Sequence, residues 1–407
     1  VLRTIMKIPD YINKVINILN ENGYEAYLVG GCVRDYMMGK TQHDFDLTTN
    51  ALPGEMLQVL ADYRIIETGI KHGTVTVVSD GENVEITTYR IDGKYLDNRR
   101  PDSVTFTRNL EEDLSRRDFT VNAMAFSPVG GLVDIFGGCD DLKRKIIRCV
   151  GVPDTRFNED GLRIMRALRF SSVLGFTIDS ETSKSIRKNK ELLKNISAER
   201  IYSELKKLLC GAGAAEVLAS YADVMGVIFP YFAEHKSIYM TNVLKIGSVD
   251  CDVITRFAAL FFGIGQSDVR ALMHLLKPDN KTLSSVVKLS EKLNEKDIGC
   301  DAASVRRLMS FFDSEDMMRF ICIMQIYRSD FAYDKFVNEY MHQLEIKPCV
   351  KISDLAVNGK DIMSFGIKQG AQIGEILKDV LNAVIEDRCA NDYESIKEYI
   401  IKNGIGQ

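Results

Sequence analysis

The chain has 407 residues, of which 45% are hydrophobic and 27% charged, and this composition is typical of a globular protein with several domains. Its net charge of −5 excludes a surface that is basic throughout. No run of about 18 apolar residues occurs and the N-terminus lacks a signal-peptide core, so neither a membrane span nor secretion is expected. The nine cysteines are scattered without a C-x-x-C pair, which favours reduced thiols in the cytoplasm over disulfides or a zinc site.

Residues 1–25 predict an amphipathic helix that ends at Asn22–Gly23. A short strand, a turn at Gly30 and Gly31 and a short helix are predicted at the start of the next segment, residues 27–49. Two glycines between a strand and a helix let the backbone come close to a phosphate, and the free N–H groups of the helix can bind it. Most glycine pairs of this kind are only turns, so the pattern alone is weak.

Asp44 and Asp46 lie in a second strand that is predicted after this helix. Residues two apart in a strand point the same way, so the two carboxylates are expected side by side. Two like charges this close need a cation between them, and hard oxygen ligands suit Mg²⁺. A lone D-x-D is usually a solvated loop, but next to the glycine turn it favours a site for nucleotidyl or phosphoryl transfer with one or two metals.

Two β-rich stretches, residues 73–79 and 84–90, predict a hairpin that turns at Asp80–Gly81. Alternation along the second strand places Glu85 on the face opposite to the apolar residues of that strand. Glu85 is therefore a candidate third carboxylate if it faces the same side as the two aspartates. The alternative is a glutamate that only faces solvent.

A polar segment with Gly and Pro, residues 91–109, predicts a loop, and a second dense motif follows at residues 114–126. Ser115 is expected to cap a helix in this motif. Arg116 and Arg117 would neutralise charge on a bound triphosphate. The alternative is an exposed pair of arginines on a helix.

The next helix is predicted to begin at Asn158, a good N-cap residue, and its polar half carries Asp160, Arg163, Arg166 and Arg169. Cytosine and adenine each present an amine donor beside a ring-nitrogen acceptor, which an aspartate and an arginine can recognise. Uracil and guanine present the reverse order. Asp160 and Arg163, adjacent on the helix surface, could thus select C and A, whereas the alternative is an ordinary i,i+3 surface ion pair.

Residues 151–210 hold twelve basic against eight acidic side chains, a positive band within an otherwise acidic chain. Such a band is compatible with a bound polyanion. Beyond residue 180 the chain is predicted to be helical throughout.

Three motifs resemble those of the class II tRNA nucleotidyltransferases (CCA-adding enzymes) and of their relatives, the bacterial poly(A) polymerases. The residues from Gly30 to Asp46, G-G-C-V-R-D followed by D-F-D, resemble the first motif. Arg116–Ala125 (R-R-D-F-T-V-N-A-M-A) resembles the second, and Glu159–Phe170 (E-D-G-L-R-I-M-R-A-L-R-F) resembles the base-selecting helix. The similarity extends to Glu199–Arg200 and, more loosely, to the rest of the chain.

The resemblance implies an α+β fold in four parts. A nucleotidyltransferase head with a mixed β-sheet and flanking helices would span residues 1–150. An all-α remainder would follow, with a neck at residues 151–212, a body at residues 213–350 and a tail at residues 351–407.

The resemblance also implies roles for the residues singled out above. Asp44 and Asp46 would hold Mg²⁺, which activates the tRNA 3′-hydroxyl and stabilises the leaving pyrophosphate, with Glu85 as the candidate third carboxylate. Asp160 and Arg163 would pair with the base. The full set expected to bind the nucleotide is Gly30, Gly31, Arg34, Arg116, Arg117, Asp160, Arg163, Arg166 and Arg169.

The expected activity is template-independent addition of C, C and A to the 3′ end of tRNA from CTP and ATP, with no membrane and no obligate protein partner. Alternatives are addition of only CC or only A, a poly(A) polymerase, or a catalytically silent RNA-binding protein. The loop from Asp92 to Arg100 is present, which favours complete addition, because relatives that add only CC tend to lack elements of it. Intact Asp44 and Asp46 argue against a silent protein.

Overall fold

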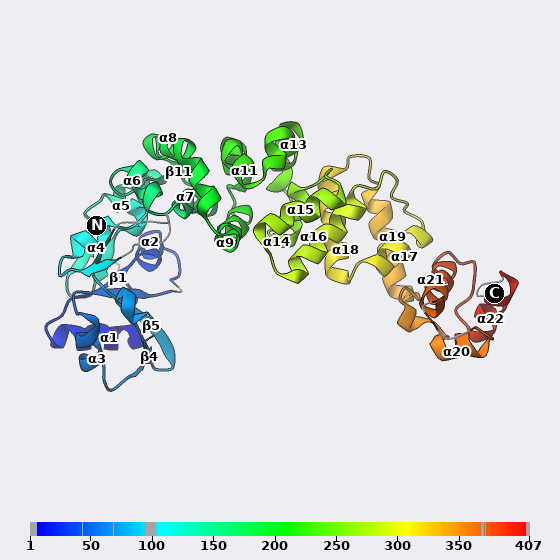
Figure 1. The fold of residues 1–407 in the computed structure, drawn as a ribbon, viewed down its shortest axis with the longest axis horizontal. Coiled ribbons are helices and arrows are strands. Elements are labelled where there is room, and N and C mark those ends of the chain that lie inside the picture. Colours follow the sequence, from blue (N-terminus) through cyan, green and yellow to red (C-terminus); the bar gives the residue numbers. More distant parts are fainter. Residues whose placement is uncertain are drawn as a thin grey trace. The chain divides into compact units, whose positions relative to one another are not determined.

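The computed structural model describes residues 6–42, 44–67, 69–93, 103–367, 370 and 372–403. Their packing separates two compact units (Figure 1). The first unit runs to Lys236 and includes Leu275–Lys277, and the second contains the remaining residues. All the functional residues predicted from the sequence belong to the first unit.

A seven-stranded mixed sheet forms the core of the first unit, which confirms the predicted head. The strands lie in the order β3-β4-β5-β2-β1-β8-β9. Strands β2 and β5 are parallel, and the other neighbouring pairs are antiparallel. The bounds are β1 (Ala26–Val29), β2 (Asp46–Thr49), β3 (Arg64–Ile66), β4 (Thr74–Ser79), β5 (Glu82–Thr88), β8 (Ala125–Ser127) and β9 (Gly131–Val133).

The predicted hairpin is β4–β5. Asp80 and Gly81, with φ of 51° and 86°, form its two-residue turn. Positive φ at both central positions is what a type I′ turn requires, and it matches the twist of the two strands.

Five α-helices flank this sheet in the sequence: α1 (Asp10–Glu21), α2 (Gly31–Met37), α3 (Pro53–Val59), α4 (Leu110–Ser115) and α5 (Gly138–Arg144). Helix α1 is the predicted amphipathic helix, and its apolar side chains are buried. The prediction for Ser115 was wrong, because it ends α4 instead of capping a helix. Asn109 is the N-cap, and its side chain accepts a hydrogen bond from the N–H of Glu111 at 2.9 Å. The first turn of α4 then contains three acidic residues, which the helix dipole favours there.

A small antiparallel pair, β6 (Arg90–Asp92) and β7 (Val104–Phe106), lies beside α4. The loop on which complete CCA addition was predicted, Asp92 to Arg100, lies almost entirely outside the described residues.

Helices α6 (Pro153–Glu159) and α7 (Leu162–Leu174) continue the first unit, and α7 packs on α9 (Ala198–Leu209). The predicted helix start at Asn158 was wrong. Pro153 begins α6, Asn158 lies in its last turn, and Asp160 is extended (φ −141°, ψ 105°) between the two helices. Gly161 is closely packed, since an added Cβ would approach the side chain of Leu192 to 3.1 Å.

Short strands and further helices complete the first unit. The strands β10 (Ile146–Ile147) and β11 (Thr177–Ile178) pair in parallel, so the neck contains one short strand that was not predicted. The remaining helices are α8 (Ser180–Asn189), α10 (Ala214–Ser220), α11 (Ala222–Ile228) and α12 (Pro230–Glu234).

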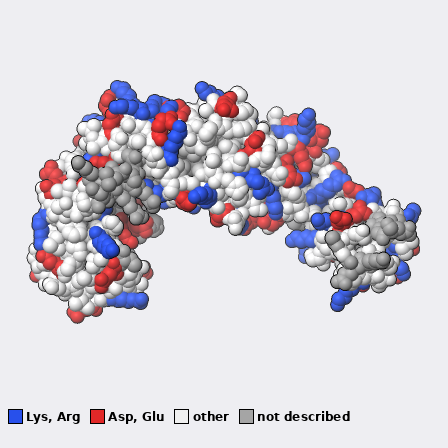
Figure 2. All heavy atoms as spheres, viewed as in Figure 1, with Lys and Arg blue, Asp and Glu red and all other residues white. Residues whose placement is uncertain are grey.

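The described part of the second unit is helical and holds no strand, as predicted. Its helices are α13 (Lys236–Ile246), α14 (Val253–Leu260), α15 (Gln266–Leu276), α16 (Asn280–Leu293), α17 (Ala302–Phe311), α18 (Ser314–Tyr327), α19 (Tyr333–Ile346), α20 (Gly359–Ser364), α21 (Gln372–Ile385) and α22 (Tyr393–Lys402). Among the described residues, no helix has the length and apolar character needed to cross a membrane. Acidic and basic side chains are interspersed on the face shown in Figure 2.

Candidate active site

Asp46 is the first residue of β2, and its side chain is exposed. In the sheet it lies between Val29 of β1 and Glu85 of β5. Directly opposite residues of neighbouring strands project from the same face, so Glu85 shares a face with Asp46. Asp44 was expected inside the strand, but it precedes the first residue of β2 by two positions and is exposed.

The pKa of Asp46 is raised. Although its side chain is exposed, the surrounding protein displaces part of its hydration, and the like charge of Glu85 raises the pKa further. Arg117 opposes this shift and Asp44 adds to it. No ion pair with any of the three carboxylates is found among the described residues. Hard oxygen donors that repel one another fit a divalent cation. The described residues do not, however, include a complete group of three ligands in position around one ion.

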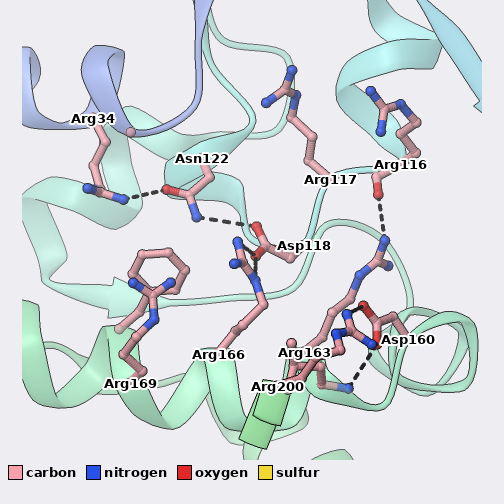
Figure 3. Close-up of a pocket in the computed structure, with 13 residues that line it drawn as sticks. Arg34, Arg116, Arg117, Asp118, Asn122, Asp160, Arg163, Arg166, Arg169 and Arg200 are labelled. Atoms are coloured by element: carbon pink, nitrogen blue, oxygen red, sulfur yellow. Dashed lines mark hydrogen bonds and ion pairs between the residues drawn. The ribbon is translucent and has the colours of Figure 1, made fainter. Parts of the chain in front are cut away.

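A cavity of about 450 Å³ lies between α2, the segment after α4, α7 and α9 (Figure 3). It is lined by Gly31, Arg34, Arg116, Arg117, Asp118, Asn122, Asp160, Leu162, Arg163, Arg166, Arg169, Phe170 and Arg200. The structure therefore brings together every predicted nucleotide residue except Gly30, although they come from three separate motifs. Seven arginines and two aspartates line the cavity. Asp113, Glu159 and Glu204 outside the lining neutralise part of the excess charge, and the cavity stays positive.

Arg117 lies between the cavity and the carboxylate of Asp46 at the start of β2. A Cβ at Gly30 would lie 3.5 Å from its Nη1, and its charge offsets part of the rise in the pKa of Asp46. Its Nε is buried and has no hydrogen-bond partner among the described residues. The guanidinium of Arg117 also lines the cavity, and an anion such as a phosphate is the ligand that suits it there. Gly30 has a φ of 74°, and this conformation lets the backbone turn from β1 into α2 next to Arg117.

A chain of hydrogen bonds spans one wall of the cavity (Figure 3). Arg34 Nη1 donates to Asn122 at 2.8 Å, Asn122 donates to Asp118 at 3.2 Å, and Arg166 Nε donates to Asp118 at 2.7 Å. Burial alone would raise the pKa of Asp118, but Arg166 and Arg163 outweigh it, so the pKa lies below its ordinary value. Asp118 and Asn122 were missed in the sequence, although both stand in the R-R-D-F-T-V-N motif.

Asp160 and Arg163 do not form the surface ion pair that was the alternative interpretation. Asp160 lies outside the helix, and its carboxylate accepts from Arg200 of α9 at 2.7 Å and from the N–H of Leu162 at 3.0 Å. Arg163 is buried and pairs with Glu159 at 2.5 Å. The expected adjacency on one helix surface is therefore wrong, yet both side chains line the same cavity. Arg200 was not predicted as a site residue.

The aromatic ring of Phe170 lies close to three guanidinium groups. Those of Arg34, Arg166 and Arg169 lie 5.3, 5.4 and 3.8 Å from the centre of its ring. Glu204 of α9 holds Arg169 at 2.6 Å, and loss of hydration lowers the pKa of Arg169. These contacts fix the directions of the arginines that face the cavity. Periodicity alone placed Arg166 and Arg169 on the polar half of the helix but could not identify Phe170 or Glu204.

Three family models match the chain. The poly A polymerase head domain matches residues 26–148, the probable RNA and SrmB-binding site of polymerase A matches residues 175–235, and the putative tRNA nucleotidyltransferase domain 2 matches residues 252–400.

Full-length relatives are similar as well. The CCA-adding enzyme of Lactobacillus helveticus is 35% identical, with 97% of this chain and 98% of that protein covered. The CCA-adding enzyme of Geobacillus thermodenitrificans is 36% identical, with 95% of each covered. The crystal structure of the Bacillus stearothermophilus CCA-adding enzyme in complex with CTP superposes with a TM-score of 0.81 at 32% identity, over 98% of each chain. Enzymes of this kind generally use a divalent metal. The chain is therefore a nucleotidyltransferase that belongs to the family of CCA-adding enzymes.

Proposed function

We propose that this chain adds C, C and A to the 3′ end of tRNA without a nucleic-acid template, from CTP and ATP with release of pyrophosphate. The observation that carries the proposal is the positive cavity that Asp160, Arg163 and Arg117 line together. The charge of Arg117 also acts on the carboxylate of Asp46 at the start of β2. Family membership supports it, because the relatives named above are CCA-adding enzymes.

Asp44 and Asp46 are proposed to hold Mg²⁺, with Glu85 opposite Asp46 as a candidate third carboxylate. The ion would activate the 3′-hydroxyl and stabilise the leaving pyrophosphate. Exposed carboxylates that carry mutual repulsion support this assignment, and a small, hard cation suits them. Arg117, which lines the cavity, then neutralises phosphate charge there.

Base selection is proposed to use Asp160 and Arg163. Arg200 and Leu162 occupy part of the hydrogen-bonding capacity of the Asp160 carboxylate, which can still accept from an exocyclic amine. Arg163 donates to Glu159 and to the carbonyl oxygens of Arg116 and Arg156. Those contacts use three of the five N–H donors of a guanidinium, so donors remain for a ring nitrogen. Arg166 and Arg169 support these residues from the same helix.

The RNA would be held by shape and phosphate contacts and not by its sequence. The match of residues 175–235 to an RNA-binding family model and the basic excess of residues 151–210 support this. The division into head, neck, body and tail at residues 150, 212 and 350 stays a prediction. We place the reaction in the cytoplasm because its substrate would be tRNA and the nine cysteines are free thiols.

The test is an extension assay on three tRNA transcripts that end before CCA, after C and after CC. Each receives CTP, ATP or both with Mg²⁺, and the products are sequenced. Addition that completes CCA and then stops is the expected result. Arrest after CC, action only on the CC-ended transcript, a long A tail, or no addition would each overturn the proposal in favour of one of the alternatives.

A further inference from the structure

Asp113 is a carboxylate of α4 whose side chain is completely buried. One of its oxygens accepts from Arg116 Nε at 3.0 Å and from Arg116 Nη2 at 2.7 Å. The other accepts from Arg117 Nη2 at 3.3 Å. A single buried residue that does not line the cavity thus holds two neighbouring arginines that do.

The same carboxylate also contacts two strands of the head. It accepts from the N–H of Arg90 at 3.3 Å, and the hydroxyl of Thr48 lies 3.4 Å from it, although that hydroxyl is closer, at 3.0 Å, to the carbonyl oxygen of Thr87. Thr48 lies in β2, two residues after Asp46, and Arg90 begins β6. Asp113 therefore connects the two arginines to β6 through a hydrogen bond and lies next to β2, the strand that begins at Asp46.

Burial alone would raise the pKa of Asp113, but Arg116 and Arg117 outweigh burial and lower it, so the side chain is ionised at neutral pH. A buried ion pair contributes little to net stability compared with apolar residues of similar volume, because desolvation offsets the attraction. It does restrict the rotamers of the arginines, which otherwise lose this freedom when a ligand binds. This arrangement therefore favours preorganisation of the cavity.

We propose that Asp113 is a positioning residue, which holds Arg116 and Arg117 in the orientation that receives the phosphates of the incoming nucleotide. The inference rests on the proposed nucleotide site in the cavity. Arg116 has a second acidic neighbour, Asp92 at 3.8 Å. For Arg117, Asp113 is the one ion-pair partner among the described residues, so the effect acts mainly through Arg117.

The experiment is equilibrium binding of CTP and ATP to the full chain without tRNA, by calorimetry, for the wild type and Asp113→Asn. We expect the Kd of both nucleotides to rise about tenfold or more, as for the loss of a hydrogen bond to a charged group. Asp316→Asn is the matched control, because Asp316 is also buried and also pairs with an arginine three residues later, Arg319 at 2.8 Å, but in the second unit. It should bind both nucleotides like the wild type.

A double-mutant cycle separates positioning from a general loss of structure. Asp113→Asn should weaken binding much less in an Arg117→Ala background, whereas a structural role would weaken it equally in both backgrounds. If Asp113→Asn does not fold, Asp113→Glu keeps the charge but displaces the carboxylate oxygens, and it should also raise the Kd. An unchanged Kd in the folded variant, or equal effects in both backgrounds, would overturn the inference.

These outcomes are distinct from those of the extension assay. A wild type that adds nucleotides to tRNA while Asp113→Asn binds them normally would overturn the positioning role alone. If the wild type binds CTP but does not add CCA to tRNA, the proposed function is overturned. The positioning role is then decided by the nucleotide Kd values of the variants alone. Absence of nucleotide binding by the wild type would overturn both.

Discussion

Replacement of Asp160 by asparagine tests base selection directly. The variant keeps the size of the side chain and one acceptor oxygen, but it exchanges the other oxygen for an amide donor. Its remaining oxygen can still accept from the N–H of Leu162 at the start of α7, while the ion pair with Arg200 is weakened. Arg163→Ala is a poorer probe, because Arg163 is buried and also holds the backbone of Arg116 at 2.9 Å.

The expected change in nucleotide selectivity is estimated from the loss of one hydrogen bond. A bond to a charged group contributes about 1.5–3 kcal/mol, and each 1.4 kcal/mol or so corresponds to about tenfold in a ratio of rate or binding constants. Asparagine can turn its amide to donate to the oxygen of uracil, which the carboxylate of Asp160 cannot do. We therefore expect the preference for CTP over UTP to fall by about tenfold to a hundredfold.

The assay measures kcat/KM for single additions of CTP and UTP to a tRNA that ends before CCA, and of ATP and GTP to one that ends after CC. Asp154→Asn is the control, since Asp154 lies on α6, pairs with Lys188 and does not line the cavity. All three proteins should bind tRNA with similar affinity. If Asp160→Asn transfers nucleotides with the selectivity of the wild type, the assignment of Asp160 is refuted.

Three further predictions follow from the same contacts. Asp46→Asn should lower the rate of transfer by at least about a thousandfold but retain CTP binding without divalent metal, and substantial residual transfer would place the metal elsewhere. Glu204→Ala leaves half-buried Arg169 without its 2.6 Å partner, so urea titration should show a loss of about 2 kcal/mol in the free energy of unfolding, and a loss below about 0.5 kcal/mol would contradict the importance of that pair. The folded pKa of Asp118 is lowered, so its ionic contribution to stability is present above an unfolded pKa of about 3.9 and is lost as the pH falls through the folded value. The stability difference between wild type and Asp118→Asn should therefore shrink below about pH 4, and an unchanged difference would show that Arg166 does not stabilise the ionised form.

Local patterns in the sequence predicted several elements of the head, whereas its mixed sheet was implied by the resemblance to a known family. The glycine turn, the D-G hairpin and the amphipathic first helix each depend on a few adjacent residues whose backbone preferences agree with the fold. The residues predicted to bind the nucleotide, apart from Gly30, line one cavity, and their roles stay predictions. Helix boundaries were less certain, since Pro153 and Asn109 compete with Asn158 and Ser115 as helix starts.

Only the tertiary structure decided which side chains meet. Asp160 pairs with Arg200, and Asp118 with Arg166, across separations of 40 and 48 residues. Glu204 reaches Arg169 because α9 packs on α7. No periodicity records such pairs, because a helix or strand pattern specifies the face on which a residue lies and not the neighbour packed against that face. The charges of the cavity could be listed from the sequence, but their partners, and with them the directions and pKa values of those side chains, depend on how the elements pack.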